Sequence, residues 1–100
     1  MRRVMVRYTV KPGEVARNEE LVHGVYAQLD RDQPDGLRYA TFRLDDGVTF
    51  VHVAEVDADP NPLTGLDAFH AFQEGIADRC DSPPAASEAH VVGSYRLFTP

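Results

Sequence analysis

The sequence lacks several features that mark common classes of protein. It contains no tryptophan, a single cysteine and no apolar run that approaches the length of a membrane span. Because Cys80 has no second cysteine to pair with, no intramolecular disulfide can form. Arg7 interrupts the first apolar stretch too early for a secretion signal. We therefore expect a cytoplasmic protein that does not associate with a membrane.

Positive charge is also scarce. The 100 residues include 10 Lys and Arg against 16 Asp and Glu, which gives a net charge of −6. Such a balance opposes attraction to phosphate backbones. Nucleic acid is therefore not an expected partner.

Motifs that would hold a cofactor or a metal are missing as well. There is no phosphate-binding glycine loop, no dinucleotide glycine signature and no nucleophile elbow. The four histidines and Cys80 do not have the spacing of a metal-ligand set. The sequence predicts neither a metal site nor a bound cofactor.

The most informative stretch is 37–56, which predicts a β-hairpin. Two runs rich in β-branched and aromatic residues flank Asp46-Gly47, a dipeptide that tolerates the positive φ angles of a tight turn. With these two residues as the loop, Arg38 lies opposite Glu55, and the opposite charges support this register. A three-residue loop with a glycine bulge is the alternative, and it keeps the alternation within each strand.

Because strand side chains alternate, the register divides the hairpin into two faces. One face reads as dry core that packs under helices, and it carries Ala40, Phe42, Val51 and Val53. The other face, called the mixed face below, combines large apolar side chains with side chains that end in polar groups. Such a face suits a hydrated cavity or a surface that contacts a partner. Its residues are Leu37, Tyr39, Thr41, Arg43, Phe50, His52, Ala54 and Val56.

The remaining segments complete a β-α-β-β-α-β order. Alternation predicts a strand over 3–10, and helical spacing predicts a helix over 14–32. A capping box at Thr64 begins a second helix, which ends before Pro83-Pro84, and alternation over 88–98 predicts the last strand. This order predicts a single α+β domain over 1–100 with a ferredoxin-like fold: an antiparallel four-stranded sheet with two helices on one face. The predicted shared core consists of Val6, Tyr8, Val25, Phe42, Val51, Val53, Phe69 and Ile76.

Two stretches, TVKPGE at 9–14 and DGLRYATFRLDDGVTFVHVAEV at 35–56, resemble the antibiotic biosynthesis monooxygenase-like family of dimeric α+β barrels. The resemblance implies a homodimer in which the helix-free sheet faces of two subunits enclose a cavity. The mixed face would then point inward. Glu55 matches a family glutamate, Asp57 stands where better-known members commonly have tryptophan, and His70 is the candidate for a histidine of the second helix.

Several residues are candidates for a small-molecule site. His52 is a candidate general base, since imidazole titrates near neutral pH, although a histidine that only hydrogen-bonds inside a cavity is the more common case. His70 is a second catalytic candidate. We predict that a ligand site lies between the helix-free sheet face and the second helix and includes His52. The candidate ligand-binding residues are Arg7, Tyr39, Thr41, Arg43, Phe50, Ser94 and Arg96; the arginines suit an anionic or enolate-like ligand and serve dimer contacts as the alternative.

Two functional classes stay open from the sequence. The first, implied by the resemblance, is a cofactor-independent monooxygenase-like enzyme that acts on a small aromatic or polyketide-like molecule. The second is a noncatalytic dimer that binds a small molecule or assists another protein. The enzyme needs an enclosed apolar pocket with a base and an oxyanion donor, whereas the binding protein needs the pocket or the surface alone.

Overall fold

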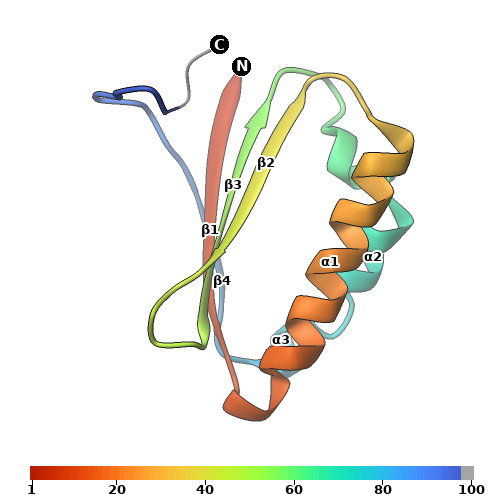
Figure 1. Cartoon of the computed structure of the whole chain (residues 1–100), viewed down its shortest axis with the longest axis vertical. Coiled ribbons are helices and arrows are strands. Elements are labelled where there is room, and N and C mark those ends of the chain that lie inside the picture. The colour runs from red at the N-terminus through yellow and green to blue at the C-terminus, as the bar shows by residue number, and fades with distance from the viewer. Residues whose placement is uncertain (98–100) are drawn as a thin grey trace.

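A computed structural model describes residues 1–97 of the chain. Four strands form one antiparallel sheet in the order β2-β3-β1-β4, and the helices cover one of its faces (Figure 1). The predicted α+β, ferredoxin-like fold is therefore confirmed. In chain order the elements are β1 (Arg2–Val10), η1 (Pro12–Glu14), α1 (Val15–Asp32), β2 (Leu37–Arg43), β3 (Thr49–Val56), η2 (Pro62–Gly65), α2 (Asp67–Gln73), α3 (Ile76–Arg79) and β4 (Cys80–Glu88).

The long helix α1 follows from its stripe of buried residues. Asn18, Val22 and Val25 repeat at three- and four-residue intervals and face the sheet. The helix closes at Gln33, whose left-handed backbone (φ 44°) lets its N–H donate to the carbonyl oxygen of Leu29. The predicted helix over 14–32 is confirmed.

The hairpin has the predicted register, with Arg38 opposite Glu55. Gly47 has a φ of 80°, a conformation that glycine adopts without strain. One oxygen of the Asp46 carboxylate accepts the backbone N–H groups of Val48 and Thr49, and the other accepts the Thr49 hydroxyl. The turn is therefore held by a side chain as well as by its backbone.

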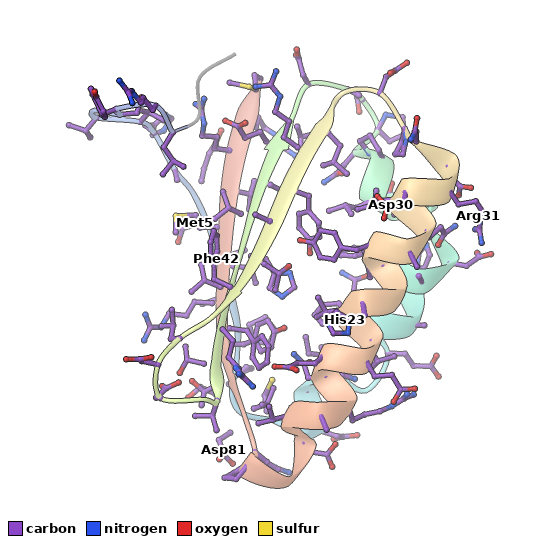
Figure 2. The ribbon with its side chains drawn as sticks, in the orientation of Figure 1. Met5, His23, Asp30, Arg31, Phe42 and Asp81 are labelled. Carbon is purple, nitrogen blue, oxygen red and sulfur yellow. The ribbon has the colours of Figure 1, made fainter. Side chains whose placement is uncertain are left out.

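The predicted assignment of the two sheet faces was wrong. The mixed face lies under the helices, where Tyr8, Phe50 and His52 are 1, 2 and 5% exposed. Met5 and Phe42 are 42 and 53% exposed, and Figure 2 shows both on the side of the sheet away from the helices. The polar tips of the covered face hydrogen-bond one another, and within residues 1–97 no buried side-chain nitrogen or oxygen lacks a hydrogen-bond partner, so that face can be buried.

The predicted core changes accordingly. Tyr8 and Val25 are buried, and Val6, Phe69 and Ile76 pack partly buried against the same cluster. Three other predicted members, Phe42, Val51 and Val53, lie on the helix-free face instead, because they alternate with the buried residues of the same strands. The core thus lies between the helices and the face that was expected to stay open.

The second half of the chain also departs from prediction. The expected single helix is divided into η2, α2 and α3, with Gly75 at φ 75° between the last two. Asn61, rather than Thr64, caps the first turn, accepting the N–H of Leu63. The last strand is β4 at 80–88, not 88–98, and it contains Pro83-Pro84. Prolines are tolerated there because β4 is an edge strand.

Residues 89–97 leave the sheet instead of forming its last strand. The N–H of Ala89 donates to the carbonyl oxygen of Arg3, and the following segment runs away from the helices (Figure 1). Ser94 and Arg96, predicted on an inward sheet face, are exposed in this segment. The predicted end of the strand at Phe98 lies outside the described residues.

Candidate functional site

A cavity of about 370 Å³ lies between the covered face of the sheet and α2. Its volume falls within the range of small-molecule sites. Most of its wall is apolar, with Val6 and Ala54 from the sheet facing Phe69 and Phe72 from α2. Polar groups of the wall come from Tyr8, Tyr39, His52, Asn61, Gln73 and Arg2. The cavity therefore suits an apolar molecule that carries a few polar atoms.

His52 lies in the wall between two tyrosine hydroxyls. Its Nε2 is 2.8 Å from the Tyr8 hydroxyl, and its Nδ1 is 2.5 Å from the Tyr39 hydroxyl. The Thr41 hydroxyl lies 3.2 Å from the same Nδ1. Burial lowers the pKa of His52 to about 4, so the imidazole is neutral at pH 7. A neutral imidazole has one donor and one acceptor nitrogen, and both have hydroxyl partners here.

Behind Tyr8 the polar contacts continue into the protein interior. The amide nitrogen of Asn18 donates to the Tyr8 hydroxyl at 2.9 Å, and the Nε of Arg79 donates to the Asn18 amide oxygen at 3.3 Å. The other Arg79 nitrogens donate to the carbonyl oxygens of Phe72 and Glu74 at 2.7 and 3.0 Å. Arg79 is thus held by neutral oxygens although it is 7% exposed.

The tyrosines of the site are neutral phenols. Burial raises the pKa of Tyr8 to about 12, and burial also raises the pKa values of Tyr39 and Tyr26. The Tyr26 hydroxyl lies 2.8 Å from that of Thr41, and its ring stacks on Tyr39 at a centroid distance of 5.4 Å. Each phenol therefore has a proton to donate at neutral pH.

The structure brings three of the predicted residues together. Tyr39 and His52 line the cavity, and Thr41 contacts His52 from beside it. Phe50 is buried and stacks on Tyr8 at 5.5 Å, as part of the core. Their functional roles stay predictions. The site geometry does correct one point, because the cavity that contains His52 lies on the helix-covered face and not on the helix-free face.

The other predicted residues lie elsewhere. Arg7 is exposed on the opposite sheet face, since it alternates with Tyr8. Arg43 is exposed and pairs with Glu19 at 2.8 Å. His70 is exposed and donates its Nε2–H to the carbonyl oxygen of Thr64 at 2.7 Å. None of the three lines the cavity around His52.

Sequence reasoning did not assign three residues of this region to the site: Tyr8, which was predicted only as a core residue, Asn18 and Arg79. Asn18 did carry a signal, because it is the polar member of an otherwise apolar helical stripe. A polar residue at such a position needs a buried partner. Arg79 carried no comparable signal, since its burial depends on carbonyl oxygens at the end of α2.

Glu55, which matches the family glutamate, lies away from the cavity. Its carboxylate is 7% exposed and pairs with Arg3 at 2.5 Å and with Arg38 at 3.9 Å. Within residues 1–97, no three His, Cys, Asp or Glu side chains are grouped so that they could hold a metal ion. The same residues contain no helix that is long and apolar enough to cross a membrane.

Solved structures of several proteins share this architecture. A Nitrosomonas europaea protein, provisionally described as an antibiotic biosynthesis monooxygenase, matches with a TM-score of 0.76 and 16% identity over 93% of this chain and 100% of its own. The chain has the fold of the antibiotic biosynthesis monooxygenase structures. Rv0793 from Mycobacterium tuberculosis matches with a TM-score of 0.73 and 15% identity over 93% of this chain and 96% of its own.

SnoaB from Streptomyces nogalater, a cofactor-independent oxygenase, matches with a TM-score of 0.68 and 16% identity over 95% of this chain and 96% of its own. At these identities the likeness is one of fold, and at that level the resemblance found in the sequence is confirmed. No protein-family model matches the chain, and a search of curated proteins finds no match.

Proposed function

We propose that the protein binds a small aromatic molecule in the cavity beside His52 and oxygenates it without a cofactor. The observation that carries this proposal is the His52–Tyr39 pair, which forms a polar end in a largely apolar cavity of about 370 Å³. The shared fold with SnoaB, a cofactor-independent oxygenase, supports the same reaction class. The proposed substrates are polycyclic aromatic or polyketide-like ketones.

Such a substrate supplies the electrons for the reaction itself. A CH₂ group conjugated to a carbonyl can lose a proton to solvent water to give an enolate, and an electron-rich enolate can reduce O₂ directly; the proton returns in the water that is formed. The overall change is R₂CH₂ + O₂ → R₂C=O + H₂O, in which the carbon is oxidised and oxygen is reduced to water and the new carbonyl. A hydrogen bond from Tyr39 to the substrate oxygen stabilises the enolate, because donors aimed at developing negative charge act strongly in an apolar cavity.

One observation favours a second function, binding without turnover. Both ring nitrogens of His52 already have hydroxyl partners, so the imidazole is not a free base facing the cavity. A binding protein needs the apolar wall and the Tyr39 donor, but it needs no acceptor for a substrate proton. The two functions share the cavity and differ in turnover.

Anthrone, a tricyclic ketone with the required CH₂ group, tests both. We expect the protein to accelerate oxygen consumption and anthraquinone formation above the uncatalysed rate, and Tyr39→Phe to reduce the catalysed rate by roughly 10²-fold. Tyr95→Phe is the matched control, because Tyr95 is 79% exposed in the terminal segment. Saturable anthrone binding without turnover favours the second function, and the absence of both binding and turnover overturns the proposed site.

We also propose that the protein is a cytoplasmic homodimer formed through the helix-free sheet face. Met5 and Phe42 are exposed on that face, beside half-buried Val51 and Val53. The terminal segment adds Val92, which is fully exposed. A contiguous apolar surface of this kind is typical of an interface, and a second copy of the same face would cover it.

A further inference from the structure

The polar contacts around His52 form one buried chain, Arg79–Asn18–Tyr8–His52–Tyr39, called the polar chain below. We infer that Arg79 and Asn18 fix the direction of every hydrogen bond in this chain, so that the site presents an O–H donor at Tyr39. The site would therefore select ligands that carry an acceptor oxygen, such as a carbonyl or an enolate. This inference rests on the proposed function, because it concerns a ligand of the same cavity.

The direction begins at Arg79, since a guanidinium can donate but cannot accept. Its Nε faces the side-chain oxygen of Asn18, which therefore has its amide nitrogen toward Tyr8. The amide nitrogen is also a donor without accepting capacity. Asn18 is 0% exposed, so no solvent competes for either group. The oxygen of Tyr8 consequently accepts a hydrogen bond from Asn18.

The proton of Tyr8 then has one acceptor among the described residues, the Nε2 of His52 at 2.8 Å. If Nε2 carried a proton instead, the Tyr8 hydroxyl would receive two hydrogen bonds and its own proton would have no acceptor. Tyr8 is 1% exposed, and an unsatisfied buried donor is costly. Tyr8 therefore donates to Nε2, and the neutral imidazole carries its proton on Nδ1.

The hydroxyl groups on the far side of His52 determine what reaches the cavity. The Nδ1–H is directed at the hydroxyls of Tyr39, at 2.5 Å, and of Thr41, at 3.2 Å, and the Thr41 hydroxyl also contacts that of Tyr26. In this direction the Tyr39 oxygen accepts a hydrogen bond from His52, so the Tyr39 proton is not used on the imidazole. That proton can be donated to another oxygen. Tyr39, unlike Thr41 and Tyr26, lines the cavity around His52.

The opposite direction would leave the Tyr39 hydroxyl without a proton for a ligand. With Nδ1 as an acceptor, Tyr39 would use its proton in the 2.5 Å contact with His52. The ligand would then meet an oxygen without a free proton. The choice between an acceptor ligand and a donor ligand is thus made by Asn18 and Arg79, neither of which lines this cavity.

The tautomer of His52 tests the direction without any ligand. Long-range ¹⁵N–¹H correlation spectra at pH 7 distinguish a proton on Nδ1 from one on Nε2, and His52→Gln assigns the signal among the four histidines. We expect the proton on Nδ1 in the unaltered protein. A proton on Nε2 would overturn the inference directly.

Asn18→Asp should reverse the direction of the hydrogen bonds from Tyr8 onward in the polar chain, with almost no change in the shape of the side chain. The new carboxylate accepts from Arg79 and also from Tyr8, so Nε2 of His52 must donate and Nδ1 must accept. We expect the tautomer to switch, and a proton that stays on Nδ1 would remove Asn18 from its positioning role. Gln33→Glu makes the same amide-to-carboxylate change at an exposed helix end and should leave the tautomer unchanged.

Two tricyclic probes, fluorenone and fluorene, test ligand selection because they differ by one carbonyl oxygen. Both probes make the same apolar contacts, so the ratio of their Kd values measures the contribution of the hydrogen bond from Tyr39 to the carbonyl oxygen. We expect Tyr39→Phe and Asn18→Asp each to reduce the preference for fluorenone by roughly twofold to tenfold, the value of one neutral hydrogen bond. A ratio unchanged in Tyr39→Phe would contradict the donor role.

The outcomes separate this inference from the proposed function. If neither probe binds the unaltered protein, the proposed cavity function fails, while the His52 tautomer still decides the direction of the polar chain. If Asn18→Asp does not fold, the tautomer of the unaltered protein and the Tyr39→Phe ratio remain decisive. If both probes bind but the His52 proton is on Nε2, the cavity is still a binding site and the inference about the polar chain is overturned.

Discussion

Acidification should destabilise the protein through His52 in a pH window that the structure defines. Burial lowers the pKa of His52 from 6.5 to about 4. In the unfolded chain the imidazole binds a proton as the pH falls through 6.5, whereas in the folded protein it stays neutral until about pH 4. The unfolded state therefore binds more protons between these values, and the free energy of unfolding falls as the pH decreases.

The expected magnitude follows from the size of the shift. Each pKa unit corresponds to about 1.4 kcal/mol, so the difference between 6.5 and about 4 gives a loss of about 3 kcal/mol between pH 7 and pH 4. This loss is a large fraction of the stability of a small domain. The contribution is fully present above pH 6.5 and is lost progressively toward pH 4.

Denaturant titrations at a series of pH values measure this effect against His52→Gln. The variant keeps a hydrogen-bonding side chain but has no imidazole to protonate, while the carboxylates that titrate in the same range are common to both proteins. We expect the free energy of unfolding of the unaltered protein to fall by about 3 kcal/mol relative to that of His52→Gln from pH 7 to pH 4. A difference that is constant across this range would refute the argument that His52 is buried and neutral.

Three further predictions concern the fold and the assembly. Phe72→Ala should cost about 3 to 5 kcal/mol in denaturant titration, because Phe72 is 5% exposed in the core, and a cost below about 1 kcal/mol would contradict its placement. Phe42→Glu should convert a species of two-chain mass to single-chain mass in sedimentation at micromolar concentration, whereas a single-chain mass before the change would refute the dimer. Gly36→Ala should lower the melting temperature, since φ is 79° and the new Cβ would lie 2.7 Å from the Cβ of Ala58; an unchanged melting temperature would show that this turn relaxes freely.

The sequence was sufficient for the hairpin because its information is local. Asp46-Gly47 determines the turn, and alternation then determines which side chains share a face, so Thr41 lies opposite His52 as predicted. Alternation does not say which face the helices cover. That choice depended on whether the tips of Tyr39 and His52 could satisfy one another when buried, which requires contacts between separate elements.

The last strand was missed for a related reason. Pro83-Pro84 is ordinarily incompatible with a strand interior, and the alternation over 88–98 offered a more regular pattern. The position of β4 at the sheet edge removes the objection, but edge and centre are properties of the assembled sheet. The contact of Asn18 with Arg79 likewise joins residues 61 positions apart, and no local pattern indicates such a pairing.

The position of the cavity bears on how association and activity are related. The cavity lies on the helix-covered face of the sheet, whereas Met5 and Phe42 are exposed on the opposite face. Pairing two chains through that opposite face would add no side chain to the cavity. Each chain would then work as an independent catalytic or binding unit. The curve of ligand saturation per chain would be hyperbolic, and it would keep the same midpoint when the protein is diluted until the dimer dissociates.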